Sequence, residues 1–207
     1  MKKAALFDLD GVIIDTEGQY STFWTRIGLQ DFPDNPTFAQ DIKGCTLVQI
    51  YEKYYPNDDE VRARVQSELD AFEKEMQYPY IKGALEFVDA LRRKGYKTAV
   101  VTSSNLAKMQ ALYSHCPTLA DHFNRVFTSE DTPRSKPCPD CYVRAAHYLG
   151  ATPEECYVFE DSVNGVRAGQ ASGAYVVGIT TTNAREVLLP YCNKVVDSFT
   201  ELAKLTE

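Results

Sequence analysis

Short apolar runs alternate with helix-like stretches along most of the chain. The predicted strands are continuously apolar, as buried parallel strands are, and several predicted helices end at Gly95, Gly150 or Gly173, where a glycine stop is expected. The predicted strands are 3–7, 98–102, 125–127, 156–159, 175–179 and 194–196. The predicted helices are 83–94, 106–115, 140–149, 163–172 and 200–204. The alternation predicts an α/β fold in which helices cover both faces of a parallel sheet.

About 65 residues between the first strand and the helix at Gly83 contain no convincing strand, which indicates a helical insertion. The clearest helix there is 58–77, and Pro79 prevents its continuation. Its apolar positions fall at near-helical spacing: Val61, Val65, Leu69, Phe72 and Met76. We expect this stripe to pack in the core of the insertion. A membrane-surface helix would need Lys and Arg on the polar face, where Asp and Glu dominate.

Charge and apolar run length exclude other classes of protein. The 207 residues include 29 acidic and 22 basic side chains, a net charge of -7, which argues against a general nucleic-acid binder. No apolar run approaches the roughly 20 residues of a membrane span. Lys2 and Lys3 precede only four apolar residues, fewer than the ~7 to 15 of a signal-peptide core. We therefore expect a cytoplasmic protein whose six cysteines are reduced thiols, and the sequence leaves its oligomeric state open.

Polar clusters follow four predicted strand or turn segments, and ligands of open α/β sheets bind beyond the carboxyl ends of strands. Each cluster alone has an ordinary interpretation, such as a helix cap or a surface charge. The clusters are Asp8-Leu9-Asp10-Gly11, Thr102-Ser103-Ser104-Asn105, Lys136-Pro137-Cys138-Pro139-Asp140 and Glu160-Asp161-Ser162. All four in this order are much harder to explain by capping, and together they predict one site.

The four clusters resemble the motifs of the haloacid dehalogenase superfamily of phosphotransferases: Asp-x-Asp, Ser or Thr, Lys, and an acidic pair. The resemblance extends over essentially the whole chain. It implies a Rossmann-like core from residues 1–14 and 82–207, with a helical cap from 15–81. Within the superfamily, Asp15-Thr16-Glu17 and Glu160-Asp161-Ser162 are similar to the β-phosphoglucomutase and sugar-phosphate phosphatase branch.

The resemblance also implies roles for single residues. Asp8 would be the nucleophile that becomes an aspartyl phosphate, and Asp10 would protonate the leaving alcohol and deprotonate the attacking water. Ser103, the amide of Ser104 and Lys136 would hold the phosphoryl group. Asp8, the backbone carbonyl of Asp10, Asp161 and the nearby Glu160 would hold Mg²⁺, a hard ion that prefers oxygen.

The resemblance leaves the reaction class to be chosen. Dehalogenation needs a carboxylate nucleophile alone, so Asp10 and the metal acids favour phosphoryl transfer. A phosphate-binding module without catalysis would lack the nucleophile or the metal acids, and both are present.

Phosphatase and mutase differ in whether water or a sugar hydroxyl accepts the phosphoryl group. β-Phosphoglucomutases carry a His soon after the first motif, where this chain has Gly18-Gln19-Tyr20. They also carry Lys-Gly-x-x-Arg, where this chain has Lys43 but Leu47 in place of the Arg. Tyr20 cannot shuttle a proton near neutrality, and Leu47 cannot clamp a second phosphate. We therefore expect a phosphatase of a small phosphorylated metabolite, such as a sugar phosphate, with the mutase as the alternative; an Arg26 or Lys53 reaching the site would favour the mutase.

Three further cap residues are candidates for substrate contact: Gln19, Tyr20 and Lys43. Other chemistry-bearing residues have simpler explanations. Cys138 and Cys141 have the spacing of a redox dithiol or half a zinc site, but no second ligand pair accompanies them. The three histidines are scattered without metal-ligand spacing, so we expect surface or packing roles for them.

Overall fold

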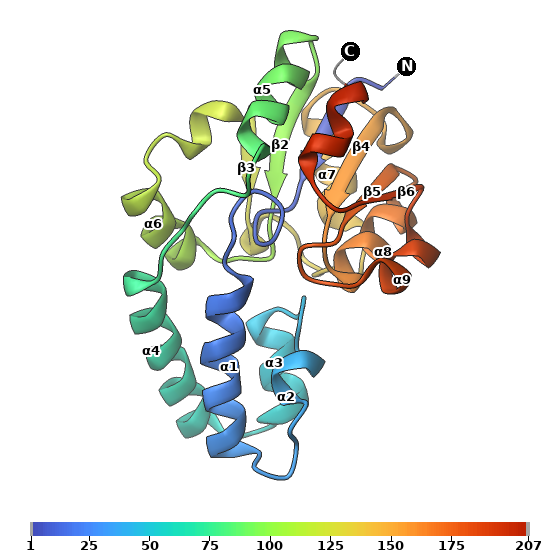
Figure 1. Cartoon of the computed structure of the whole chain (residues 1–207). Coiled ribbons are helices and arrows are strands. Elements are labelled where there is room, and N and C mark those ends of the chain that lie inside the picture. Colours follow the sequence, from blue (N-terminus) through green and yellow to red (C-terminus); the bar gives the residue numbers. More distant parts are fainter. Residues whose placement is uncertain (1, 206–207) are drawn as a thin grey trace.

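A computed structural model describes residues 2–205, and a six-stranded parallel sheet lies at its centre (Figure 1). The strand order is β3-β2-β1-β4-β5-β6, and every neighbouring pair runs parallel. The strands are β1 (Ala4–Phe7), β2 (Lys97–Val101), β3 (Arg125–Phe127), β4 (Cys156–Glu160), β5 (Tyr175–Ile179) and β6 (Lys194–Val196). The predicted α/β fold is confirmed, and each strand lies within one residue of its expected bounds.

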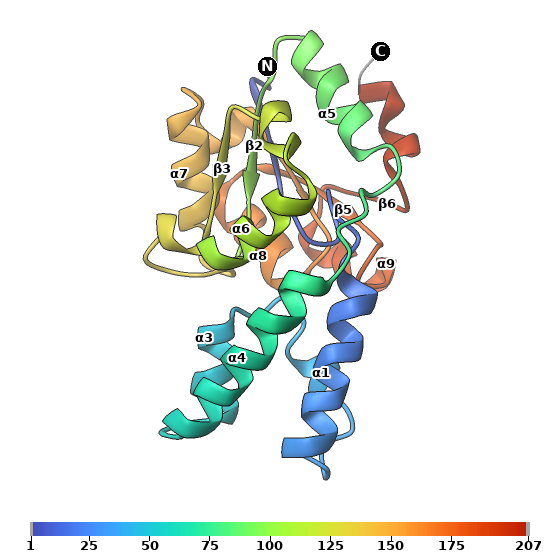
Figure 2. The same cartoon turned by 90° about the vertical axis from the view of Figure 1, so that its left-hand side faces the viewer.

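Helices cover both faces of the sheet, and each face has its own apolar core (Figures 1 and 2). In β1, Ala5 and Phe7 pack into one core, and Ala4 and Leu6 pack into the other. Both faces of the strand are therefore buried, which explains why its sequence is an unbroken apolar run. Helices α5 (Ala84–Arg93) and α6 (Leu106–His115) contribute to the first core. Helices α7 (Asp140–Tyr148), α8 (Val163–Ser172) and α9 (Arg185–Leu188) contribute to the second.

Short 3₁₀ segments replace or extend α-helices at several places in the core. The C-terminal helix predicted at 200–204 is one of them, since Phe199–Leu205 forms the 3₁₀ helix η5. Hydrophobic spacing does not distinguish a 3₁₀ helix from an α-helix, although a 3₁₀ run of seven residues is longer than most. The others are η1 (Leu119–His122), η2 (Ser129–Asp131), η3 (Pro153–Glu155) and η4 (Leu189–Tyr191).

The insertion after β1 forms a separate helical layer with its own core, seen below the sheet in Figures 1 and 2. Its helices are α1 (Glu17–Asp31), α2 (Phe38–Asp41), α3 (Leu47–Tyr54) and α4 (Asp59–Glu75). Aromatic side chains fill much of this core, and Phe32 stacks on Phe38 with ring centroids 4.8 Å apart. We call this layer the cap.

The predicted cap helix at 58–77 is α4. The side chain of Asp58 caps it by accepting a hydrogen bond from the backbone N–H of Val61 at 3.0 Å. Val65 and Leu69 are buried in the cap core, and Val61 and Phe72 pack against it. The stripe therefore has the packing role expected from its spacing, except that Met76 joins the core of the sheet domain.

Two chain segments connect the cap to the sheet, and they run side by side. The N–H of Asp15 donates to the carbonyl of Pro79 at 2.8 Å, and the N–H of Ile81 donates to the carbonyl of Ile13 at 2.9 Å. The side chain of Gln19 stabilises the same connection: its Nε2 donates to the carbonyl of Gln77 at 2.7 Å, and its Oε1 accepts from the N–H of Gln77 at 2.8 Å. We propose that the domain boundaries lie in this paired connection, at 14/15 and 81/82.

Within residues 2–205, none of the helices combines the length and apolarity needed to cross a bilayer. The cytoplasmic location stays a prediction.

Candidate active site

A cavity of about 550 Å³ lies between the carboxyl ends of the strands and the cap. The loops after β1, β2 and β4 supply Asp8, Asp10, Ser103 and Asp161, and the cap supplies residues of α1, α3, α4 and the segment before α3. Two hydrogen bonds link the cap to the core at lining residues of this cavity: Gln49 Nε2 donates to the carbonyl of Lys136 at 3.1 Å, and Asn164 Nδ2 donates to that of Gly44 at 2.9 Å. All four predicted polar clusters contribute to its wall.

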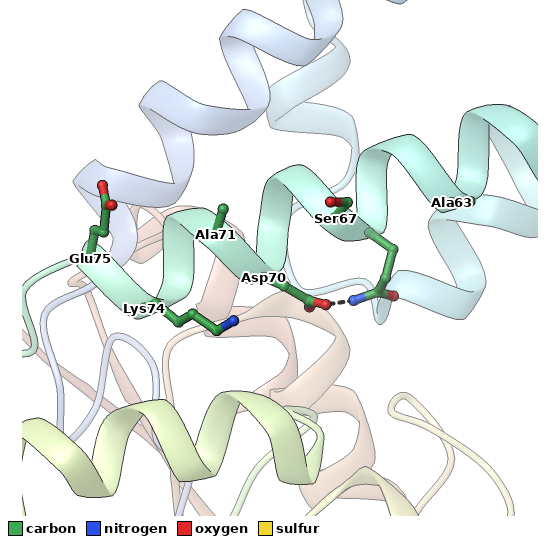
Figure 3. Close-up of a pocket in the computed structure, with 7 residues that line it drawn as sticks. Ala63, Ser67, Asp70, Ala71, Lys74 and Glu75 are labelled. Carbon is green, nitrogen blue, oxygen red and sulfur yellow. Dashed lines mark hydrogen bonds between the residues drawn. The ribbon is translucent and has the colours of Figure 1, made fainter.

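A second hollow lies along α4 and contains no comparable chemistry (Figure 3). All of its lining residues come from this one helix. Asp70 and Lys74 lie on its wall, and Gln66 donates to Asp70 at 2.7 Å. The chemistry-bearing residues of the sequence motifs therefore gather in the first cavity.

Lys136 stands at the centre of the site, with only 4% of its surface exposed. Its Nζ lies 2.6 Å from Asp8 Oδ1, 2.7 Å from Glu160 Oε1 and 3.0 Å from the carbonyl of Val101. Although burial works in the opposite direction, these two carboxylates hold the pKa of Lys136 well above its usual range. Lys136 is thus a fixed positive charge beside Asp8.

Glu160 is fully buried and holds Lys136 in place. One of its oxygens accepts from Lys136 and from the hydroxyl of Tyr142, which is 2.7 Å away. The other accepts from the N–H groups of Asp161 and Ser162 at 3.1 and 3.2 Å, and from the Ser162 hydroxyl. Both oxygens of Glu160 therefore already accept hydrogen bonds, and one of them holds Lys136.

Three buried carboxylates meet where a cation would bind. Ligand atoms of Asp8, Glu160 and Asp161 all lie within 4.8 Å of one another. Burial and the neighbouring acids raise the pKa of Asp161 well above its usual range. Burial, with Glu160 and Asp10, raises the pKa of Asp8 to about 7, against the opposing charge of Lys136. This concentration of negative charge and oxygen donors fits a hard divalent cation such as Mg²⁺.

Gly11 leaves room for Asp161. Its φ of 75° lies in the left-handed region, and a Cβ there would come within 1.9 Å of Asp161 Oδ2. The hydroxyl of Thr182 donates to the same carboxylate oxygen, and Asn183 Nδ2 donates to the carbonyl of Asp161 at 2.8 Å. Thr182 therefore holds the Asp161 carboxylate, and Gly11 lets the backbone of the first motif pass close to it because it has no side chain.

Asp10 has a different environment from Asp8. Its carboxylate accepts hydrogen bonds from Thr16 at 2.6 Å, Ser104 at 3.1 Å and Lys108 Nζ at 2.6 Å. Although burial works in the opposite direction, Lys108 and these donors hold the pKa of Asp10 below its usual range. Without a cation in the site, Asp10 is thus the more readily ionised of these two carboxyl groups.

The loop after β2 forms the wall near Asp10. Ser103 and Ser104 both line the cavity, as predicted. The Ser104 hydroxyl donates to Asp10, and the Ser104 N–H donates to Thr102 Oγ1 at 3.0 Å. This N–H would have to give up its bond to Thr102 before it could bind a phosphoryl oxygen. Asn105 caps α6 by accepting from the N–H of Lys108 at 2.9 Å.

Two of the three cap candidates face the cavity. Lys43 pairs with Glu17 at 2.6 Å, and the Tyr20 hydroxyl donates to the buried Glu73 at 2.7 Å. Gln19 is absent from the described lining residues, because its side chain is engaged with Gln77 in the connection to the cap. The expectation of substrate contact by Gln19 therefore does not match its position.

Lys108 is the functional candidate that sequence reasoning missed. It is 6% exposed, and its ammonium lies between Asp10 and the Tyr20 ring, 4.5 Å from the ring centroid. The available signal was its position, a lysine in the first turn of the helix that directly follows the Thr102-Ser103-Ser104-Asn105 cluster.

The cysteines and histidines stand apart from this chemistry. All six cysteines are free thiols, and Cys141 is buried in the sheet core. His122 Nδ1 lies 2.9 Å from Asp89 Oδ1, and His115 Nε2 lies 3.2 Å from the carbonyl of Lys74. Among the residues described as lining the cavity there is no histidine.

Comparison with known proteins adds independent findings to this geometry. A relative from Saccharomyces cerevisiae, named as a probable pseudouridine-5'-phosphatase, is 29% identical over 211 residues, covering 90% of this chain and 86% of that protein. Hexitol phosphatase B of Escherichia coli O157:H7 is 27% identical over 213 residues, covering 96% and 93%. The crystal structure of a β-phosphoglucomutase from Clostridium difficile matches with a TM-score of 0.77 over 100% of this chain and 97% of that one, at 20% identity, which shows the fold alone.

The family model described as haloacid dehalogenase-like hydrolase matches residues 2–173. This match includes β1 to α8 and therefore all four polar clusters. The chain belongs to the haloacid dehalogenase-like hydrolases, a family of enzymes.

Proposed function

We propose that the chain is a Mg²⁺-dependent phosphatase that transfers the phosphoryl group of a small phosphorylated metabolite to Asp8 and then to water. Separate sets of contacts hold the two carboxylates, Lys136 at Asp8 and Thr16, Ser104 and Lys108 at Asp10, and this supports two different roles. The phosphatase names of two relatives agree with it.

In the first step, a carboxylate oxygen of Asp8 attacks phosphorus and the bond from phosphorus to the leaving oxygen breaks. Asp10, which must be protonated when the substrate is bound, gives its proton to that oxygen, so the product leaves as an alcohol and Asp8 carries an acyl phosphate. Lys136, fixed by Glu160, offsets the charge of the Asp8 carboxylate and of the phosphoryl oxygens. Ser103 lies on the wall where it can donate to those oxygens.

In the second step, Asp10 takes a proton from water and the resulting hydroxide attacks phosphorus. The bond from phosphorus to Asp8 breaks, which regenerates the carboxylate and releases inorganic phosphate. Asp8, the carbonyl of Asp10 and Asp161 would hold Mg²⁺, with Glu160 behind them. The ion would neutralise charge on the phosphoryl oxygens and on the acids around it.

The single observation that favours water over a sugar acceptor is the charge pairing of the cavity wall. Its lining cations within the described residues are Lys43, Lys108 and Lys136, and each is paired with a carboxylate: Glu17, Asp10 and Asp8 respectively. A second phosphate on the substrate would therefore meet no free cation there. A mutase needs one, because its bisphosphate intermediate must be held at both ends.

Arg26 and Lys53 of the cap do not supply a cation for a second phosphate. Arg26 pairs with Glu68 at 2.7 Å, and Lys53 lies over the Tyr54 ring at 4.7 Å from the centroid. Neither is among the described residues that line the cavity. The cap geometry thus supports a substrate with one phosphate.

An assay of the acceptor tests this choice. With β-glucose 1-phosphate, catalytic glucose 1,6-bisphosphate and Mg²⁺, we expect little glucose 6-phosphate, measured through NADPH by a coupled dehydrogenase. In a parallel screen of phosphorylated sugars, polyols and nucleotides, we expect at least one compound to release inorganic phosphate faster than glucose 6-phosphate forms. Rapid bisphosphate-dependent NADPH formation with little free phosphate would instead establish the mutase.

A further inference from the structure

Lys108 occupies a place in the site that the two steps above leave without a role. It is buried on the first turn of α6, and its Nζ lies 2.6 Å from Asp10 Oδ2. On its other side is the ring of Tyr20, a cap residue whose hydroxyl donates to Glu73. The ammonium is therefore confined between a core carboxylate and a cap aromatic ring.

The contacts of Asp10 define what Lys108 contributes. Thr16 donates to Oδ1, whereas Ser104 and Lys108 both donate to Oδ2. The two oxygens thus have fixed and different partners, which sets the rotation of the carboxyl group. Lys108 supplies the charged contact, and a charge-assisted hydrogen bond is shorter and stronger than one from a hydroxyl. Without it, Oδ2 would keep only the longer bond from Ser104.

We propose that Lys108 is a positioning residue that aligns the carboxyl group of Asp10 with the leaving oxygen and, in the second step, with the attacking water. The inference rests on the proposed function, because it assigns Lys108 to the proton transfers of that reaction. The contact of Lys108 with Asp10 is separate from the contacts that hold Asp8. Lys136 and Glu160 orient the nucleophile, and Lys108 orients the proton-transfer group. Misalignment of such a group is costly, because proton transfer requires hydrogen-bond reach.

The competing explanation is that Lys108 binds the phosphoryl group directly. The two explanations differ in how the rate depends on the leaving group. A phosphate-binding lysine contributes equally to esters of similar size, whereas a residue acting through Asp10 matters most when the leaving oxygen needs a proton. Phenyl phosphate and p-nitrophenyl phosphate form a suitable pair, because they have nearly the same shape and the nitro group stabilises the departing phenolate.

The test compares Lys108→Met with the native enzyme in kcat/KM, which reports events up to the departure of the phenol. General acid catalysis contributes about 100-fold or more, so kcat/KM for phenyl phosphate should fall by about 100-fold. For p-nitrophenyl phosphate it should fall by less than about 5-fold, because that leaving group needs little protonation. Hydrolysis of the acyl phosphate also depends on Asp10, so the variant should show a burst of p-nitrophenolate close to one equivalent of enzyme.

Two further variants complete the design. Lys108→Arg keeps a charged donor and should recover a large part of the phenyl phosphate activity. Lys74→Met makes the same chemical change at an exposed lysine of α4, in the second hollow (Figure 3), and should leave both substrates unaffected. Thermal melts check folding, and Lys108→Gln replaces the Met variant if that protein does not fold.

Equal losses for the two substrates, or no loss for either, would overturn the role of Lys108. In both cases the proposed function would stand as long as phosphate release still required Asp8. Loss of the Asp8 requirement would instead refute the proposed function itself.

Discussion

Replacing Asp8 with Asn should lower phosphate release by at least about 10,000-fold, because it removes the oxygen nucleophile and nearly preserves the shape. Lys136 keeps its bond to Glu160 in this variant, so the buried lysine retains a charged partner. The change also removes one of three crowded carboxylates. We therefore expect a melting temperature within about 4 °C of the native protein, a shift of roughly 1 kcal/mol for a chain of this size.

Asp15→Asn is the matched control for that experiment. Asp15 is exposed in the same loop and is not among the described residues lining the cavity, so the identical chemical change should leave phosphate release unaltered. Assays of both variants on the best substrate of the screen, at saturating Mg²⁺, give the comparison. Substantial turnover by a folded Asp8→Asn protein would rule out the covalent step.

Replacing Asp161 with Asn should raise the Mg²⁺ concentration needed for half-saturation by more than about 10-fold, the loss that even an outer-shell change can cause. The reason is that one anionic ligand of a small set disappears, while Asn can still accept the hydrogen bond from Thr182. Calorimetric titration of the protein with Mg²⁺ measures this loss independently of activity.

The same variant has a second expected property that separates metal binding from folding. Because burial beside Glu160 and Asp8 makes the Asp161 charge unfavourable, its removal should not lower the melting temperature in the absence of Mg²⁺. Asp59→Asn, at a side chain 94% exposed on α4, serves as the control. If Asp161→Asn bound Mg²⁺ like the native protein, the assignment of the metal ligands would be wrong.

The fold could be predicted in most of its detail because the apolar signal is local. Each parallel strand is buried on both faces, so β1 and β4 read as continuous apolar runs, and several following helices end at a glycine. The distinction between α and 3₁₀ geometry at Phe199–Leu205 could not be read, since both place apolar residues at similar spacing.

The candidate site was predictable where residues follow strands, and less so where helices converge. Asp8, Ser103 and Asp161 follow from strand ends that meet at one edge of the sheet, and Lys136 follows from the turn before α7. Lys108 does not, because its role depends on the approach of α6 to the first motif and to the cap.

Two other assignments needed three-dimensional information. The hydrogen bonds of Glu160 with Lys136 and Tyr142 depend on contacts between distant segments, which sequence spacing does not show. Gln19 follows the first motif closely in sequence, but its rotation about the axis of α1 directs it to Gln77. Which cap residues face a cavity is set by how the helices pack, and spacing does not specify that.

The most direct test of the central claim is to look for the phosphoryl group on Asp8. The native enzyme is mixed with a good substrate and Mg²⁺, quenched in acid within milliseconds, and digested for mass spectrometry. The account predicts a peptide containing Asp8 that carries one added phosphoryl group, which disappears as substrate is exhausted and is absent from Asp8→Asn. Phosphate release at full rate with Asp8 unmodified at every quench time, or the added group on another residue, would contradict it.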